Sequence, residues 1–136
     1  MLPHRKPFLF VDEIIETKYM ESAIGSRLVK DDEFWAEGHF PGNPVFPGVL
    51  TLETMAQVGG FIFANDEGEM PDGNFAFLSK VDGLKFTRKI IPGDRIIVEA
   101  KLIEKYAPYY KTKVVARVNN RKMAEAEIVY TFMKKL

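Results

Sequence analysis

His39 and Glu53 carry side chains that can exchange protons, and both lie in one unusual segment, EGHFPGNPVFPGVLTLETMAQ, residues 37–57. His39 belongs to a loop stiffened by three prolines, and Glu53 belongs to the apolar stretch that follows. A carboxyl group in an apolar setting tends to keep its proton, and a neutral carboxylic acid is what a general acid requires. A histidine held still in a rigid loop suits a general base. The pair therefore indicates acid–base chemistry.

Gly48 adds a third chemical group, because it lies where the apolar stretch is predicted to begin a helix. Free main-chain N–H groups and the positive end of the helix dipole meet there, and they can stabilise a carbonyl oxygen that gains negative charge. A base, an acid and an oxyanion site suit removal of a proton α to a carbonyl, with loss of a β-substituent. Each residue also has a structural interpretation: Glu53 pairs with an arginine or meets solvent, His39 bonds a neighbouring carbonyl, and Gly48 serves only the turn.

The helix that carries Glu53 is predicted to cover residues 49 to about 65. Its apolar residues go most of the way round, which is typical of a helix that is buried on all sides. At about 100° per residue, Glu53 and Gln57 share one face with two small residues, Gly60 and Ala64. This face leaves room for a ligand beside the carboxyl group.

The sheet is predicted from runs that are rich in β-forming residues or that alternate with a period of two, at residues 75–80, 84–88, 96–103, 110–118 and 124–132. Residues 7–30 also have extended character, and PGD at 92–94 and NNR at 119–121 are predicted turns. Short turns imply an antiparallel sheet, whose apolar face needs the helix as a cover. We therefore expect an α+β fold, with one domain over residues 1–136 and a sheet curved over one central helix.

The composition excludes several classes of function. Nineteen basic and nineteen acidic residues give a net charge of zero, which argues against a general binder of nucleic acid or of an anionic membrane. Without cysteine, the chain has no disulfides, thiolate catalysis or cysteine-ligated zinc, and a reducing cytoplasm is expected. No apolar run approaches the roughly 18 residues of a membrane-spanning helix. Two distant histidines do not make a metal site, so His4 is interpreted as structural.

Three segments resemble one known family: LPHRKPFLFVD at 2–12, GHFPGNPVFPGVLTLETMAQ at 38–57 and LKFTRKIIPGD at 84–94. They are similar, in matching order, to the β-hydroxyacyl-acyl-carrier-protein dehydratases of bacterial fatty acid synthesis. The resemblance implies a hot-dog fold, in which an antiparallel sheet wraps around one long central helix. It also implies that the two proton-exchanging residues of one site come from different subunits. The working unit would then be a homodimer, and family members often assemble further as trimers of dimers.

The resemblance assigns a role to each residue of the central motif. His39 would remove the α-proton of a 3-hydroxyacyl thioester, and Glu53 would protonate the departing hydroxyl. The N–H of Gly48 would bind the thioester carbonyl, the carbonyl of Val45 would orient the histidine ring, and Gln57 would help to position Glu53. The product would be a trans-2-enoyl thioester on the phosphopantetheine arm of acyl carrier protein. No metal, flavin or nucleotide is expected.

Two further sets of residues are interpreted less specifically. Four aromatic residues either line an acyl tunnel or belong to the core: Phe61, Phe63, Phe75 and Phe77. Four basic residues either meet the acidic carrier protein or form a solvated charged strand: Lys85, Arg88, Lys89 and Arg95.

Other activities of the same fold stay open at this point. Isomerising members of the family often carry aspartate where this chain has Glu53, which favours simple dehydration. The same dehydration could serve a polyketide or polyene pathway. A non-catalytic module that binds acyl thioesters would be expected to lose His39 or Glu53, and this chain keeps both. A thioesterase on this fold usually lacks the GHFPGNP signature.

Overall fold

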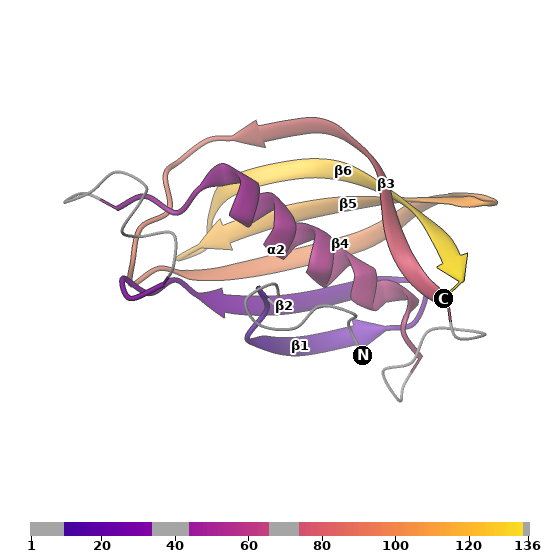
Figure 1. The fold of residues 1–136 in the computed structure, drawn as a ribbon, viewed down its shortest axis with the longest axis horizontal. Coiled ribbons are helices and arrows are strands. Elements are labelled where there is room, and N and C mark those ends of the chain that lie inside the picture. The colour runs from indigo at the N-terminus through magenta and orange to yellow at the C-terminus, as the bar shows by residue number, and fades with distance from the viewer. Residues whose placement is uncertain (1–9, 34–43, 66–73, 135–136) are drawn as a thin grey trace.

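The computed structural model describes residues 10–33, 44–65 and 74–134, and within these ranges six strands form one antiparallel sheet (Figure 1). The order across the sheet is β1-β2-β4-β5-β6-β3, so β1 and β3 are the edge strands. One α-helix and a 3₁₀ turn follow β2 in the described sequence. The elements are β1 Glu13–Lys18, β2 Ser22–Leu28, α2 Gly48–Gly60, η1 Phe61–Phe63, β3 Asn74–Phe86, β4 Arg95–Tyr106, β5 Tyr109–Val118 and β6 Arg121–Lys134.

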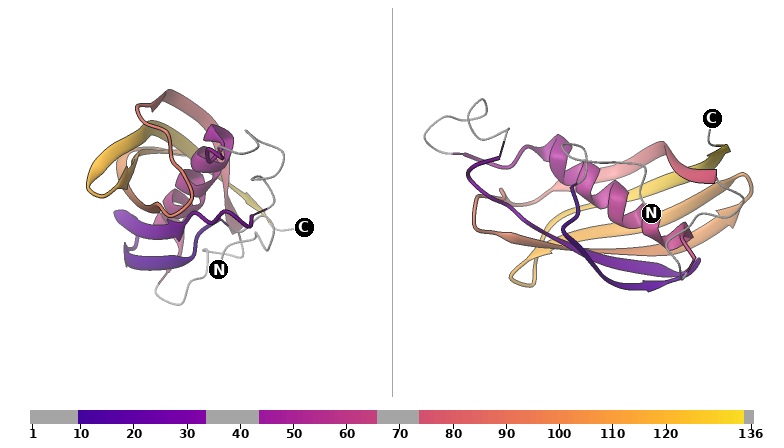
Figure 2. Two further views of the ribbon diagram at one scale, coloured as in Figure 1. Left: turned by 90° about the vertical axis from the view of Figure 1, so that its left-hand side faces the viewer. Right: turned by 60° about the horizontal axis from the view of Figure 1, so that its bottom comes forward.

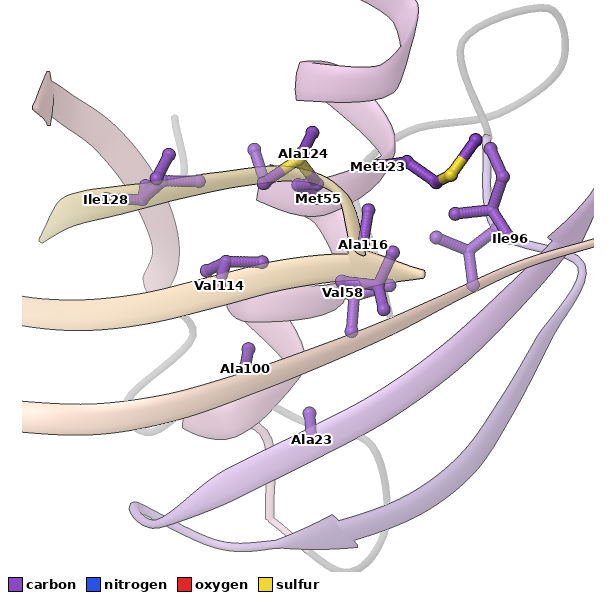
Figure 3. Packing of buried hydrophobic residues seen from close by; sticks show 14 of the residues in the cluster. Ala23, Met55, Val58, Ile96, Ala100, Val114, Ala116, Met123, Ala124 and Ile128 are labelled. Carbon is purple, nitrogen blue, oxygen red and sulfur yellow. The ribbon is translucent and has the colours of Figure 1, made fainter. Parts of the chain in front are cut away.

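The sheet curves around α2, as an end-on view makes plain (Figure 2). The side chains on its concave face alternate with outward ones, and in β4 they are Ile96, Val98 and Ala100, all fully buried. Small residues of neighbouring strands, such as Ala23 and Ala116, face Met55 and Val58 of the helix (Figure 3). Short side chains let the helix axis lie close to the strands. The predicted α+β architecture, with a sheet around one helix, is confirmed.

The convex face of the sheet carries ion pairs between neighbouring strands. Nη1 of Arg117 lies 3.7 Å from Oε1 of Glu99, and Nζ of Lys113 lies 3.4 Å from Oε2 of Glu125. Hydrogen bonds from Lys122 and then from Lys113 lower the pKa of Glu125 below its usual value. Exposed pairs add little to the free energy of unfolding. They mark this face as the one that meets solvent.

The helix departs from its prediction in length and in burial. It ends at Gly60 and continues as the 3₁₀ turn η1, whereas a helix to about residue 65 was predicted. The paired glycines Gly59 and Gly60 favour this early end, because glycine is a poor helix former. The prediction of burial on all sides is also wrong. Val49 is 74% exposed and Glu53 is half-buried, because the sheet covers only one side of the helix start.

Strand β3 is continuous where two separate strands were predicted. Its pairing with β6 shifts between Leu78 and Lys80 and again between Asp82 and Lys85. Gly83 lies in the second irregularity with φ of 61°, a conformation that suits glycine. The sequence around Gly83 reads as a break, but a bulge absorbs it and the strand goes on. The turns predicted at 92–94 and 119–121 are confirmed, with positive φ at Gly93, Asn119 and Asn120.

Within the described ranges, the structure contains no helix with the length and hydropathy of a membrane span.

Candidate active site

Glu53 lies in the second turn of α2, on the side of the helix that the sheet leaves open. His39 lies outside the described residues, so its predicted meeting with Glu53 stays a prediction. Glu53 interacts electrostatically with Tyr130 of β6. Burial raises the pKa of the Tyr130 hydroxyl well above its ordinary value, and the negative charge of Glu53 raises it further. The Glu53 carboxylate therefore lies within electrostatic reach of a buried hydroxyl that stays protonated.

Gln57, one turn after Glu53, is buried, and its side chain has a defined partner. Its Oε1 accepts a 2.9 Å hydrogen bond from the main-chain N–H of Phe10. This bond joins the helix to the chain just before β1. The main chain at Phe10 thus contacts the helix at Gln57, whereas Glu53 and Val49, earlier on the same face, are more exposed. The role predicted for Gln57 in positioning Glu53 stays a prediction.

Gly48 is the first residue of α2, and Pro47 precedes it in an extended conformation with no side-chain cap. The first helical turn contains no acidic residue, so no carboxylate there neutralises the positive end of the helix dipole. A Cβ atom on Gly48 would lie 3.0 Å from the ring of Phe86. Close packing against that ring is thus a structural reason for glycine, and it stands beside the predicted role of its N–H.

A pocket of about 390 Å³ opens at the start of α2. The residues that line it include Val45 and Gly48 from one segment of the chain, and Phe86, Arg88 and Lys89 from another. The structure therefore brings together the two residues whose main chain was predicted to act in the site and two of the predicted carrier contacts. Sequence reasoning missed Phe86, which is 50% exposed. Its place in the LKFTRKIIPGD motif was the signal that could have identified it.

The four predicted carrier contacts are all exposed. Arg88 and Lys89 also line a second pocket, of about 620 Å³, together with Arg121 from the start of β6. Lys85 pairs in register with Glu125, and Arg95 begins β4; neither lines either of these two pockets. Arg121 was missed because it is separated in sequence from the other basic residues.

The predicted tunnel aromatics differ from one another in burial. Phe63 is fully buried and packs edge-on against Tyr130 and Phe132, with ring centres 5.4 and 5.2 Å apart. The core interpretation therefore holds for Phe63. Phe61 is half-buried at the end of the helix, and Phe77 is 46% exposed on the edge strand β3. The side chain of Phe75 lies outside what the structure describes.

Among residues 10–33, 44–65 and 74–134, no group of three or more histidine, aspartate or glutamate side chains could hold a metal ion.

The sequence pattern of the FabA-like domain family matches residues 2–130. The chain belongs to this family. The match spans all three motifs that carried the resemblance, and it includes the segment with His39 and Glu53.

Curated relatives are similar to this protein over nearly the whole chain. One is the 3-hydroxyacyl-[acyl-carrier-protein] dehydratase FabZ of Enterococcus faecalis, which is 40% identical and is matched over 96% of this chain and 91% of its own. The protein of the same name from Bacillus pumilus is 38% identical over 100% of this chain and 93% of its own.

Solved structures show the hot-dog fold more broadly. The dehydratase heterocomplex ApeI:P of Xenorhabdus doucetiae matches with a TM-score of 0.80 at 14% identity, over 98% of this chain and 89% of that one. A thioesterase superfamily member of Thermus thermophilus matches with a TM-score of 0.68 at 15% identity, over 96% and 88%. Such low identity shows the fold alone, and the predicted hot-dog fold is confirmed.

Proposed function

We propose that the protein is a hydro-lyase that removes water from 3-hydroxyacyl-acyl carrier protein and forms trans-2-enoyl-acyl carrier protein in fatty acid biosynthesis. The observation that carries this proposal is the identity of 38–40% with dehydratases named for that reaction, over at least nine-tenths of each chain. The local structure is consistent with this function, because the start of α2 is exposed at Val49 and the Glu53 side chain is only half-buried, so a substrate can approach both.

The proposed reaction divides the work among three groups. The imidazole of His39 takes the proton from the α-carbon, and the electron pair moves toward the thioester carbonyl. The N–H of Gly48, at the positive end of α2, stabilises the charge on that oxygen. Protonated Glu53 then gives its proton to the β-hydroxyl, which leaves as water. In this scheme the residues of the chain supply every proton transfer, and the proposed reaction needs no metal, flavin or nucleotide.

We further propose that a second copy of the chain completes each site, with His39 of one subunit opposite Glu53 of the other. Exposed apolar residues near the start of α2 and on the edge strand β3 support this. Val49 is 74% exposed beside Glu53, and Phe77 and Leu78 are 46% and 38% exposed on the edge strand β3. Solvated apolar residues on an unpaired strand edge favour association. A trimer of such dimers is the larger assembly that we propose.

The carrier protein is the proposed partner that delivers the substrate. Arg88 and Lys89 are exposed and line the pocket that begins at Gly48, so an acidic protein bound there would bring its prosthetic arm to the helix start. A role in bacterial fatty acid synthesis would place this encounter in the cytoplasm.

The direct test offers 3-hydroxyacyl carrier protein of several chain lengths to the purified protein and identifies the products by mass spectrometry. Loss of one water with a trans-2 double bond is the expected result. A cis-3 product would reveal additional isomerisation. Release of a free fatty acid without dehydration would indicate a thioesterase and overturn the proposal, as would recovery of unchanged substrate at every chain length.

A further inference from the structure

Arg27 of β2 holds a guanidinium group in the interior of the protein. The residue is only 6% exposed. Its guanidinium carbon lies 5.1 Å from the centre of the Phe10 ring and 5.2 Å from the centre of the Phe46 ring, so the cation is within reach of two aromatic faces. Its Nη2 donates a hydrogen bond to Oε1 of Glu33 in an ion pair. One side chain thus contacts three separate segments.

Two of these contacts flank the segment that contains His39. Glu33 is the last described residue before that segment, and its other carboxylate oxygen accepts a 2.6 Å hydrogen bond from the N–H of Lys30. Phe46 follows the segment, two residues before α2 begins, and its N–H donates a 2.7 Å hydrogen bond to the carbonyl of Ile90. Arg27 therefore contacts the chain both before and after His39.

The third contact leads to the helix that carries Glu53. Phe10 packs on the guanidinium, and its N–H donates to Oε1 of Gln57, one turn after Glu53. The contacts of Arg27 therefore join the described residues on either side of the His39 segment to the helix that carries Glu53. The ion pair and both cation–π contacts lie within one chain.

Stability alone is a poor reason for this arrangement. A buried ion pair costs desolvation, and an apolar side chain of similar size would often do as well or better. The Nε of Arg27 has no hydrogen-bond partner among the described residues, which adds to that cost. What arginine provides is a planar group that stacks on two rings and bonds a carboxylate in one fixed orientation. Such a group sets the relative positions of the segments that it joins.

We propose that Arg27 is a positioning residue for dehydration, which aligns the two ends of the His39 segment with helix α2. This inference rests on the proposed roles of His39 and Glu53. It assigns Glu33, Phe10 and Phe46 as the partners through which Arg27 acts.

The test compares Arg27→Met, which keeps an unbranched chain but loses the charge and the planar group, with Arg117→Met as a matched control. Arg117 is also an arginine on a strand with a carboxylate partner, but it lies on the convex face. We expect Arg27→Met to lower kcat by about 10- to 100-fold with KM changed by less than about 3-fold, as misplaced catalytic groups do. Arg117→Met should match the wild type, and Arg27→Lys should recover only part of the loss.

A readout independent of turnover is the imidazole NMR signal of His39, identified as the signal that His39→Asn lacks. In Arg27→Met this signal should shift or broaden, and in Arg117→Met it should not. If Arg27→Met fails to fold, Glu33→Gln breaks the same ion pair from a carboxylate that is 16% exposed. An unchanged His39 signal together with wild-type kcat, in whichever of the two variants folds, would overturn the proposal. If the wild type itself forms no enoyl product, the proposed function fails, and the NMR signal still decides whether Arg27 positions His39.

Discussion

The hydroxyl of Tyr130 donates a 2.6 Å hydrogen bond to the main-chain carbonyl of Ala56, and so joins strand β6 to the middle of helix α2. The bond is possible because Gly59, about one helical turn after Ala56, has no side chain. A Cβ atom there would lie 2.3 Å from the Tyr130 hydroxyl. Since Glu53 precedes Ala56 by one helical turn, this contact helps to fix the height of the proposed acid above the sheet.

Gly59→Ala should destabilise the protein, although alanine is normally the better helix former. The clash with a buried, hydrogen-bonded ring should outweigh the gain in helix propensity and lower the free energy of unfolding by about 1–3 kcal/mol. Gly60→Ala is the matched control, because a Cβ atom there meets nothing within 4 Å. It should raise the free energy of unfolding by about 0.5–1 kcal/mol. Urea unfolding of both variants measures this, and equal effects at the two positions would contradict the packing described here.

Tyr130 should also make the protein less stable in alkali. Burial raises its pKa in the folded state, so the folded protein keeps the phenol proton at pH values where the unfolded chain loses it. This contribution is fully present below a pH of about 10, the ordinary pKa of tyrosine, and is lost as the pH rises further. Urea midpoints at increasing pH above that value should fall more steeply for the wild type than for Tyr130→Phe. Parallel curves would show that Tyr130 ionises equally in both states.

If Arg88 and Lys89 contact the carrier protein, reversing their charges should change KM only for a substrate attached to the carrier, and the change should depend on salt. Replacing Arg88 and Lys89 with glutamate should raise KM for the acyl carrier protein substrate, and the effect should shrink at high ionic strength because salt screens charges. A pantetheine thioester without the protein should be affected far less. Lys105→Glu is the control: it reverses one charge near the end of β4, at a residue that does not line the pocket, and it should leave KM unaltered. Equal losses with both substrates would mean that the two residues do not recognise the carrier.

The sheet could largely be predicted from the sequence because its signal is local. Strands β4, β5 and β6 alternate apolar and polar residues, and that period of two follows from strand geometry itself. The helix was harder. Its apolar composition suggested burial on all sides, but burial depends on what covers each face, and the sheet covers one side only. The prediction for β3 was wrong because a sequence does not reveal whether Asp82 and Gly83 form a turn or a bulge.

The residues of the proposed site also differ in whether a local sequence signal marks them. His39, Glu53 and Gly48 stand in one motif, so their residue types and a family resemblance were enough to predict their roles. Arg27 and Tyr130 carry no such signal. Tyr130 meets Ala56 from 74 residues away, and Arg27 meets rings on either side of it in the sequence. Contacts of this kind arise only when the chain has folded, and we propose that they position the groups to which we assign catalytic roles.

Sharing of sites between subunits can be tested by mixing two inactive variants. If His39 and Glu53 of one site come from different chains, a dimer of His39→Ala with Glu53→Gln contains one intact site. Refolding equal amounts together should restore about a quarter of the wild-type number of sites. Random pairing makes about half of the dimers mixed, and each mixed dimer has one intact site of its two. Analytical ultracentrifugation confirms that dimers are present. Absence of any recovered activity in the mixed dimers would assign both residues to one chain.

In the proposed reaction, Glu53 supplies the proton that lets the hydroxyl leave as water. The most direct measurement is the single-turnover rate of enoyl formation by Glu53→Gln, with Glu99→Gln on the convex face as the matched control. Glutamine keeps the size of the side chain but cannot donate a proton from a carboxyl group, so the rate should fall by about 100- to 10,000-fold. The control should keep the wild-type rate. A Glu53→Gln rate within about 2-fold of the wild type would contradict the account.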